Sequence, residues 1–236
     1  MEMKKYILIL LMTSFFVQSQ EKAYWGCFNF SVDNNSDAEE LVEAMDALFE
    51  SPAGEMIPYT VFLTQIEFKN SNEDFTHQLC FLGQDASVFK GWGGGPPPTP
   101  EGKLLNKIFE QVAEWEGSVL GSPLIFDPSK VGYKYANIWG VDVKDIPKYA
   151  DLAGGFIAAN SNNFDGTIEL HEIISGGNDH VTHIMIARSN DLGDWLKGRE
   201  AVLANPGSEK FLTTANKYST TIQSFSSTTL RVYNSP

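Results

Sequence analysis

The chain has 236 residues, a formal net charge of −13, 42% hydrophobic residues and 20% charged residues. These apolar and charged fractions exclude a disordered chain, and the length allows one large domain or two of about 110 residues. The acidic balance argues against a nucleic-acid-binding protein, because phosphate groups are bound by clustered Lys and Arg side chains.

Residues 1–19 predict a secretory signal peptide. Lys4 and Lys5 precede the uncharged segment 6–17, and Ser19 is a small residue at the end of the expected leader. This uncharged segment is too short to span a bilayer, and no later segment is apolar over a membrane-spanning length. A short buried first helix is the alternative. We expect an exported protein, periplasmic or extracellular, with no membrane span.

The first half of the chain predicts, in order, a strand, a helix, two strands, a helix and a strand. Ser36 and Glu39 form a capping-box pattern at the start of the first helix. Thr99 and Pro100 suit the start of the second helix, which is expected to end near Gly117. The strands are predicted over 24–32, 59–68, 75–82 and 118–126.

Segment 91–98, GWGGGPPP, connects the third predicted strand to the second helix. Its Gly and Pro content excludes regular structure. It has neither the spacing nor the terminal Lys-Ser/Thr of a phosphate-binding loop. It is either a plain connection or a mobile lid in which Trp92 contacts a ligand.

The second half predicts the same order of elements. Asp145 caps the first helix of this half, and Asn205 and Pro206 start the last helix. An additional helix is expected over 191–203, where the first half has its Gly- and Pro-rich segment. The strands are predicted over 133–143, 167–174, 180–188 and 221–233.

Short sequence matches relate the two halves. Residues 75–77 (Phe-Thr-His) are matched by residues 181–183 (Val-Thr-His), an offset of 106. Other matched pairs lie at offsets of up to 109, as expected for two copies of one unit with small changes of loop length. We therefore expect two repeats, residues 20–128 and 129–236, after the leader.

The order strand, helix, strand, strand, helix, strand is that of a ferredoxin-like unit, whose sheet carries helices on one face only. The third predicted strand of each half is apolar at consecutive positions, 79–82 and 184–187, which indicates a sheet buried on both faces. We expect an α+β fold in which the two ferredoxin-like repeats pack sheet to sheet. In element order and duplication, over residues 22–234, the chain resembles the dimeric α+β-barrel superfamily, in a tandem form that is monomeric.

The resemblance implies a cavity between sheet and helices. Members of this superfamily include cofactor-free monooxygenases, haem-degrading and haem-dependent enzymes, and isomerases of small molecules. The haem-degrading members use Asn, Trp and His side chains. Asn137 and Trp139 lie on a predicted strand here, but no helix carries the matching His, so no catalytic role is transferred. Asn137 and Trp139 are candidates for ligand binding, together with Trp92 and His77.

Two histidines and a glutamate lie on the predicted hairpin of the second half. If a five-residue turn joins its strands, His171 faces His183, and Glu169 lies diagonally beside His183 on the same face. Two imidazoles and a carboxylate at this spacing suit a divalent metal or acid–base catalysis. A structural polar pair is the alternative, because a shift of one residue places one His on the opposite face.

Cys27 and Cys80 are the two cysteines of the chain. An oxidising compartment permits a disulfide between them. Buried free thiols are the alternative, because free cysteine is common in protein interiors.

From these observations we expect a soluble exported protein that binds a small, partly apolar ligand or a protein partner without catalysis and without a cofactor. The alternative is an enzyme of the resembled fold. It would be a cofactor-free oxygenase or isomerase, or would use metal or haem near His171 and His183.

Overall fold

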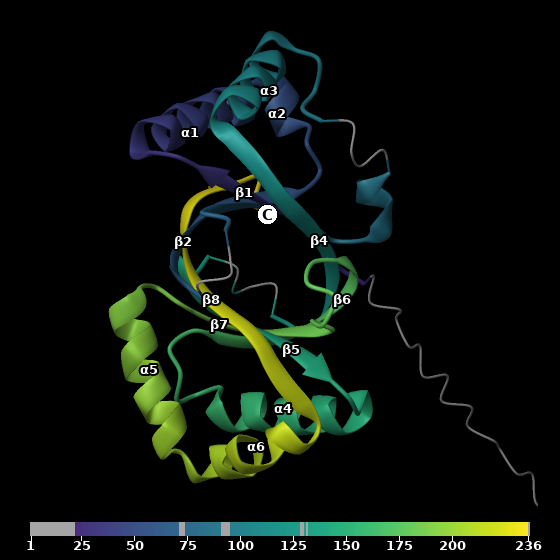
Figure 1. The fold of residues 1–236 in the computed structure, drawn as a ribbon, viewed down its shortest axis with the longest axis vertical. Coiled ribbons are helices and arrows are strands. Elements are labelled where there is room, and N and C mark those ends of the chain that lie inside the picture. The colour runs from purple at the N-terminus through teal and green to yellow at the C-terminus, as the bar shows by residue number, and fades with distance from the viewer. Residues whose placement is uncertain (1–21, 71–73, 91–94, 128–129, 131, 236) are drawn as a thin grey trace, which may run out of the picture.

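The structure, a computed structural model, describes residues 22–70, 74–90, 95–127, 130 and 132–235. In this part of the chain, eight strands close into one antiparallel barrel with helices on its outside (Figure 1). The strands are β1 (Tyr24–Val32), β2 (Thr60–Lys69), β3 (His77–Gly83), β4 (Ala113–Ile125), β5 (Tyr135–Val143), β6 (Thr167–Gly176), β7 (His183–Ser189) and β8 (Ser219–Tyr233). The α-helices are α1 (Asn35–Phe49), α2 (Pro52–Glu55), α3 (Pro100–Val112), α4 (Ile146–Asn160), α5 (Leu192–Ala204) and α6 (Glu209–Thr214). The mixed α+β class expected from the sequence is confirmed.

The barrel has the strand order β1-β3-β2-β8-β5-β7-β6-β4. The first half of the chain contributes the run β4-β1-β3-β2, and the second half contributes β8-β5-β7-β6. Pairing of β2 with β8 and of β4 with β6 joins the two runs into a closed barrel. Helices α1 to α3 lie outside the first run, and α4 to α6 lie outside the second (Figure 1).

Polar side chains set the helix starts, but the expected cap of the first helix is wrong. Asn34, not Ser36, caps α1: its backbone is extended, and its side chain accepts a hydrogen bond from the amide of Asp37 at 3.0 Å. The other caps agree with the sequence, because Thr99 caps α3 and Asp145 caps α4.

Helix α3 ends at Val112, five residues before the expected end near Gly117. The reason is tertiary: from Ala113 onward the backbone pairs with β1, where Trp115 lies opposite Phe30. A strand partner satisfies the amide groups of these residues, so the helix has no advantage over the strand there.

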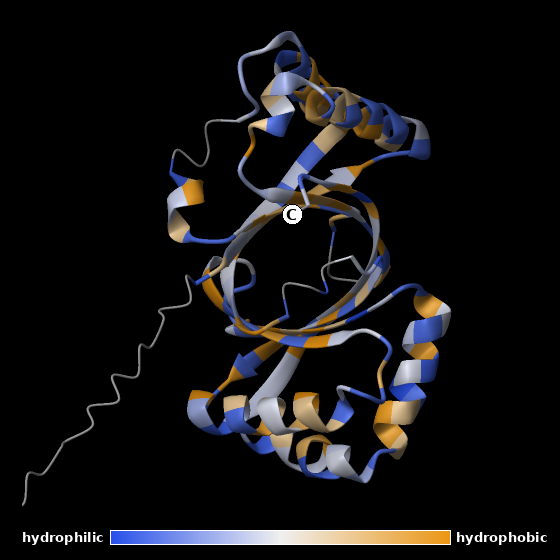
Figure 2. Ribbon diagram, turned by 180° about the vertical axis from the view of Figure 1, so that it is seen from behind, coloured by the Kyte–Doolittle hydropathy of each residue, from blue (hydrophilic) through white to orange (hydrophobic). Residues whose placement is uncertain are grey.

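The strands are buried on both faces, as the apolar runs predicted. On β7, Met185 and Ala187 belong to the core beneath the helices of the second half, while Ile184 and Ile186 face the barrel interior. A matching core around Phe30 lies beneath the helices of the first half. Figure 2 shows hydrophobic residues along both the strands and the helices.

Two threonines make the same contacts in the two halves. Thr76 accepts a hydrogen bond from the amide of Val32 at 2.9 Å, and Thr182 accepts one from the amide of Val143 at 2.9 Å. The other matched bonds are Thr76 N to Phe30 O and Thr182 N to Val141 O, both 3.0 Å, and Ile66 N to Thr76 O and Ile173 N to Thr182 O, 2.8 and 2.9 Å. These bonds relate β5 to β1, β6 to β2, and β7 to β3 residue by residue.

Cys27 and Cys80 are joined by a disulfide in the structure. They lie directly opposite each other on β1 and β3, and both line the interior of the barrel. The disulfide therefore belongs to the wall of the interior space and not to the cores beneath the helices.

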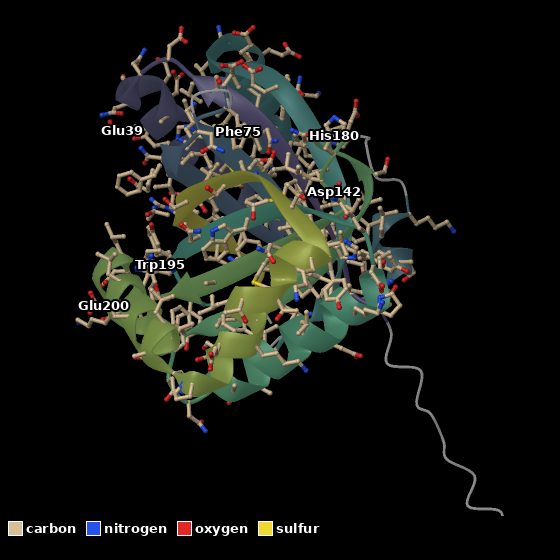
Figure 3. All side chains as sticks on the ribbon, turned by 60° about the horizontal axis from the view of Figure 1, so that its bottom comes forward. Glu39, Phe75, Asp142, His180, Trp195 and Glu200 are labelled. Carbon is tan, nitrogen blue, oxygen red and sulfur yellow. A yellow bond between two sulfur atoms is a disulfide. The ribbon has the colours of Figure 1, made fainter. Side chains whose placement is uncertain are left out.

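The outer surface carries much of the acidic charge. Glu39 on α1 and Glu200 on α5 are exposed and lie on the outside of the molecule (Figure 3). None of the helices in the described part of the chain is long and apolar enough to cross a membrane.

Candidate functional site

The interior of the barrel contains a cavity of about 660 Å³. Residues from all eight strands line it, and they include both apolar and polar side chains. Between the sheet and the helices, where the resemblance implied a cavity, the structure has a hollow of about 230 Å³ beside α4. Ligand sites for small molecules have volumes of about 300–1,000 Å³, so the barrel interior is the candidate site.

Strand β6 directs two polar side chains into this cavity wall. Its residues alternate between faces: His171 lines the cavity, Glu169 lies on the same face two residues away, and Leu170 packs in the core beneath the helices. Glu169 is 1% exposed and His171 is 4% exposed.

Three donors surround the carboxylate of Glu169. Thr167 Oγ1 donates to Oε1 at 2.7 Å, and Arg188 Nε lies 3.2 and 3.3 Å from the two carboxylate oxygens. His171 Nε2 lies 3.0 Å from Oε2. Arg188 reaches the carboxylate because it pairs with Thr167 across β6 and β7.

The carboxylate is ionised in these surroundings. Burial on its own would raise the pKa of Glu169. The positive charge of Arg188, the hydrogen bond and charge of His171 and the hydrogen bond from Thr167 outweigh burial and lower the pKa to about 2. An ionised carboxylate only accepts hydrogen bonds. His171 Nε2 must therefore carry the proton of their shared hydrogen bond.

In the neutral form of His171, Nδ1 then has a free lone pair. Nδ1 is buried and has no hydrogen-bond partner among the described residues. Trp25 Nε1 and Thr64 Oγ1 are also buried without a partner, and their residues line the same cavity. Buried polar atoms usually have partners, so three unpaired ones around a cavity indicate a place for a polar ligand or water.

Two aromatic rings contact the imidazole of His171. The ring centroids of Trp25 and Phe126 lie 5.9 and 6.0 Å from that of His171. Trp25 reaches across β4 because Gly121, its partner in the strand pair, has no side chain. A Cβ at Gly121 would overlap both the Trp25 indole and the backbone oxygen of Glu172.

Gly121→Ala is therefore expected to destabilise the protein by about 1–3 kcal/mol, since the indole must move away from His171. Urea unfolding followed by tryptophan fluorescence measures the loss. Gly155→Ala on α4 is the matched control, because a Cβ there meets no atom within 4 Å and alanine favours a helix. A Gly121→Ala variant as stable as wild type would contradict this packing.

The expected pairing of His171 with His183 is wrong. His171 lies opposite Ile184, and His183 lies opposite Glu172, one residue away from the expected register. His183 therefore lies on the other face of the sheet, where its Nδ1 is 3.0 Å from Thr182 Oγ1. Glu169 and His171 come together, but His183 cannot join them as a ligand or base.

The remaining candidates also lie apart from the cavity. Asn137 and Trp139 share the face of β5 beneath the helices of the second half. His77 stacks on Phe30 in the core of the first half, with ring centroids 5.6 Å apart. Trp92 lies outside the described residues.

Sequence reasoning missed Arg188, Trp25 and Phe126. The one available signal was Arg188, a charge at the end of a strand that is otherwise apolar on its interior face. The hairpin register decides whether Arg188 reaches Glu169, and the sequence does not determine that register.

No family model matches the sequence, and no curated protein shows significant similarity to it. Solved structures do share the fold. A putative monooxygenase from Lactobacillus acidophilus NCFM is 8% identical with a TM-score of 0.64, and the match covers 90% of this chain and 96% of that one. A putative monooxygenase from Fusobacterium nucleatum is 12% identical with a TM-score of 0.62, covering 91% and 95%. An anthrone oxidase-like protein is 10% identical with a TM-score of 0.58, covering 91% and 94%. The chain therefore has the dimeric α+β-barrel fold that its element order predicted.

The non-catalytic binding role expected from the sequence is wrong. The solved structures with this fold are described as monooxygenases and as an anthrone oxidase-like protein, which point to an enzyme. Others are described as a putative chlorite dismutase and as a haem-binding protein from Thermus thermophilus, with TM-scores of 0.54 and 0.53.

The residues of this chain do not fit a haem. The hollow beside α4 is small, and its described lining residues include no His, Cys, Met or Tyr to ligate iron. In the barrel interior, His171 is the one His among the described lining residues, which include no Met or Tyr; its ring contacts Trp25 and Phe126, and its Nε2 is hydrogen-bonded to Glu169. A metal site fits no better, because the described residues contain no cluster of three His, Cys, Asp or Glu side chains.

Proposed function

We propose that this protein is a cofactor-free oxygenase that removes a proton from a small, partly apolar molecule inside the barrel. His171 is the general base and Glu169 positions it. The observation that carries the proposal is the buried Glu169–His171 pair, whose free Nδ1 belongs to a cavity-lining residue. The oxygenase names of the structural neighbours favour this reaction over isomerisation.

The chemistry needs only the substrate, dioxygen and the base. His171 Nδ1 takes a proton from an acidic C–H group and leaves an enolate. The enolate carbon bonds to one oxygen atom of O₂, and the proton held by His171 passes to the other, which gives a hydroperoxide. Loss of water from the hydroperoxide forms a second carbonyl group. With anthrone as substrate, one O₂ is consumed and anthraquinone and water are formed.

Glu169 supports this cycle in two ways. Its hydrogen bond fixes the proton of neutral His171 on Nε2, so that Nδ1 is the basic atom. Its negative charge stabilises the imidazolium that forms when Nδ1 accepts a proton. General-base catalysis of this kind contributes about 10²–10⁴-fold to a rate.

His171→Ala is expected to slow anthrone oxidation by about 10²-fold or more, because the base is removed. Oxygen uptake in the presence of anthrone, corrected for the rate in buffer, measures the effect. His180→Ala is the control, since His180 is exposed on the turn between β6 and β7 (Figure 3). Retention of the wild-type rate by His171→Ala, or a wild-type rate equal to that of buffer, would contradict the proposal.

We further propose that residues 20–128 and 129–236 are two copies of a ferredoxin-like unit. The strand runs β4-β1-β3-β2 and β8-β5-β7-β6 and the matched threonine bonds support this relation. Because one chain then provides both sheets of the barrel, we propose a monomer. Export is also proposed, and the Cys27–Cys80 disulfide supports it because disulfides persist in oxidising compartments.

A further inference from the structure

The two halves place different side chains at matching positions of the cavity wall. The threonine bonds that relate β6 to β2 and β7 to β3 make Phe62 the counterpart of Glu169, and Leu82 the counterpart of Arg188. Phe62, Leu82 and Arg188 line the cavity, and Glu169 accepts a hydrogen bond from Arg188. One half is therefore charged where the other is apolar.

These two sets lie on opposite walls. In the closed order of eight strands, β2 and β6 are separated by three strands in either direction, and so are β3 and β7. The wall with Glu169, His171 and Arg188 thus faces the wall with Phe62 and Leu82. A ligand between them meets Glu169, His171 and Arg188 on one side. On the other side it meets Phe62 and Leu82, with the polar Thr64 at the position that matches His171.

Arg188 has donors that the described residues do not use. Its Nε donates to Glu169, while no described residue accepts a hydrogen bond from its two terminal amino groups. The side chain is 25% exposed, and the residue lines the cavity. A guanidinium held through Nε presents its remaining N–H groups in a fixed plane, which suits a negatively charged oxygen.

Charge balance indicates which ligand suits this wall. The charges of Glu169 and Arg188 cancel, and His171 has a free base atom, so a permanent anion would leave a net negative charge inside an acidic protein. A neutral ligand that gives its proton to His171 adds no net charge. The new anion then lies near Arg188, and the new imidazolium lies next to Glu169.

We infer that Arg188 binds the oxygen atom on which negative charge forms, and that the ligand is a phenol or an enolisable ketone with an apolar body against Phe62 and Leu82. This inference rests on the proposed function for the choice of the barrel interior as the ligand site. It adds a second catalytic residue and the side of the cavity against which the apolar body of the substrate packs.

Phenolate binding tests the role of Arg188 apart from turnover. The probes are 4-nitrophenol, at a pH where it is fully ionised, and 4-nitrotoluene, which has a similar shape and no acidic oxygen. The test pair is Glu169→Gln against Glu169→Gln/Arg188→Leu, because neither variant contains the buried Glu169 charge. Asp74 and Glu116, which also line the cavity, are kept in both variants. Glu169→Gln/Arg199→Leu removes an exposed positive charge as the control.

The variant without Arg188 is expected to bind 4-nitrophenolate about tenfold or more weakly than Glu169→Gln, with 4-nitrotoluene affinity changed less than about threefold. The Arg199 control is expected to bind both probes as Glu169→Gln does. Equal phenolate affinity with and without Arg188, or no binding of either probe by wild type, would overturn the inference. A different result would contradict the proposed function and leave this inference intact. In that case His171→Ala would keep the wild-type rate of anthrone oxidation, while phenolate binding would still depend on Arg188.

Discussion

Arg188→Leu is expected to destabilise the protein by about 3–5 kcal/mol near neutral pH. Glu169 is 1% exposed, and without Arg188 its negative charge keeps only the hydrogen bonds from Thr167 and His171. A buried charge that loses its partner costs far more than the pair contributes as a whole. Urea unfolding of the variant and of wild type measures the difference in the free energy of unfolding.

A second substitution in the same chain is the matched control. Glu169→Leu/Arg188→Leu is expected to recover most of the loss and to lie within about 1 kcal/mol of wild type. The first half shows that the fold accepts this change, because Phe62 and Leu82 occupy the matching positions. If the double variant lost as much free energy of unfolding as Glu169→Leu and Arg188→Leu lose together, the two residues would not be a coupled buried pair.

The same pair predicts an acid dependence with a definite sign. The pKa of Glu169 is about 2 in the folded chain against 4.5 for the ordinary side chain. The contribution of ionised Glu169 to the stability of the folded chain is complete at pH values above 4.5, and it is lost as the pH falls toward about 2. The difference in the free energy of unfolding between wild type and Arg188→Leu is therefore expected to become smaller in acid. Protonation of Glu169 removes the buried charge that lacks a partner in the variant.

Stability does not explain why this chain contains the pair. The counterpart wall of Phe62 and Leu82 closes the same barrel with apolar side chains. Replacing a buried ion pair by apolar residues is often neutral or stabilising, so the pair is better explained by function. The asymmetry between two matching walls therefore marks the reactive side of the cavity.

The sequence predicted the elements of the fold well because their signals are local. Helical spacing after Thr99 and Asp145, and consecutive apolar residues on β3 and β7, depend on neighbours along the chain. The duplication expected from the sequence then implied that the open faces of the sheets cover each other. The end of α3 was missed because pairing with β1, a distant segment, decides it.

The site could be predicted only in part, for a physical reason. Glu169 and His171 share a face of one strand, so any register brings them together. His183 was wrongly added because the turn holds Gly176 and Gly177, both with positive φ, and pairs Glu172 with His183. A shift of one residue moves every side chain of a strand to the other face.

Trp25 shows the second limit. It contacts His171 across β4, and this requires β1, β4 and β6 to lie side by side in the closed barrel. No local pattern encodes that order. Gly121, the residue that makes the contact possible, is indistinguishable in sequence from any other strand glycine.

Stability is also expected to fall by about 3 kcal/mol between neutral pH and about pH 4 because of His77. His77 is 6% exposed, and burial lowers its pKa from 6.5 to about 4. Its ring stacks on Phe30, its Nδ1 is 2.9 Å from Thr76 Oγ1, and its Nε2 has no partner among the described residues. A second proton on His77 would place a positive charge among aromatic rings, and no described carboxylate is hydrogen-bonded to the ring to stabilise that charge.

The sign follows from the lowered pKa. Below 6.5 the unfolded chain binds a proton at His77, whereas the folded chain does not until the pH nears 4. The contribution of neutral His77 to stability is therefore complete above pH 6.5, and it is lost as the pH falls from 6.5 to about 4. Burial also lowers the pKa of His183, with a partial opposing effect of Glu172, so His183 adds a loss in the same direction.

Urea unfolding at a series of pH values separates these contributions. His77→Phe keeps an aromatic ring against Phe30 and cannot be protonated, so its free energy of unfolding is expected to fall less steeply in acid than that of wild type. His180→Gln, at an exposed position, is expected to keep the full wild-type slope. If His77→Phe lost stability in acid as steeply as wild type, His77 would not be the buried group that resists protonation, and the acid response would belong to other groups.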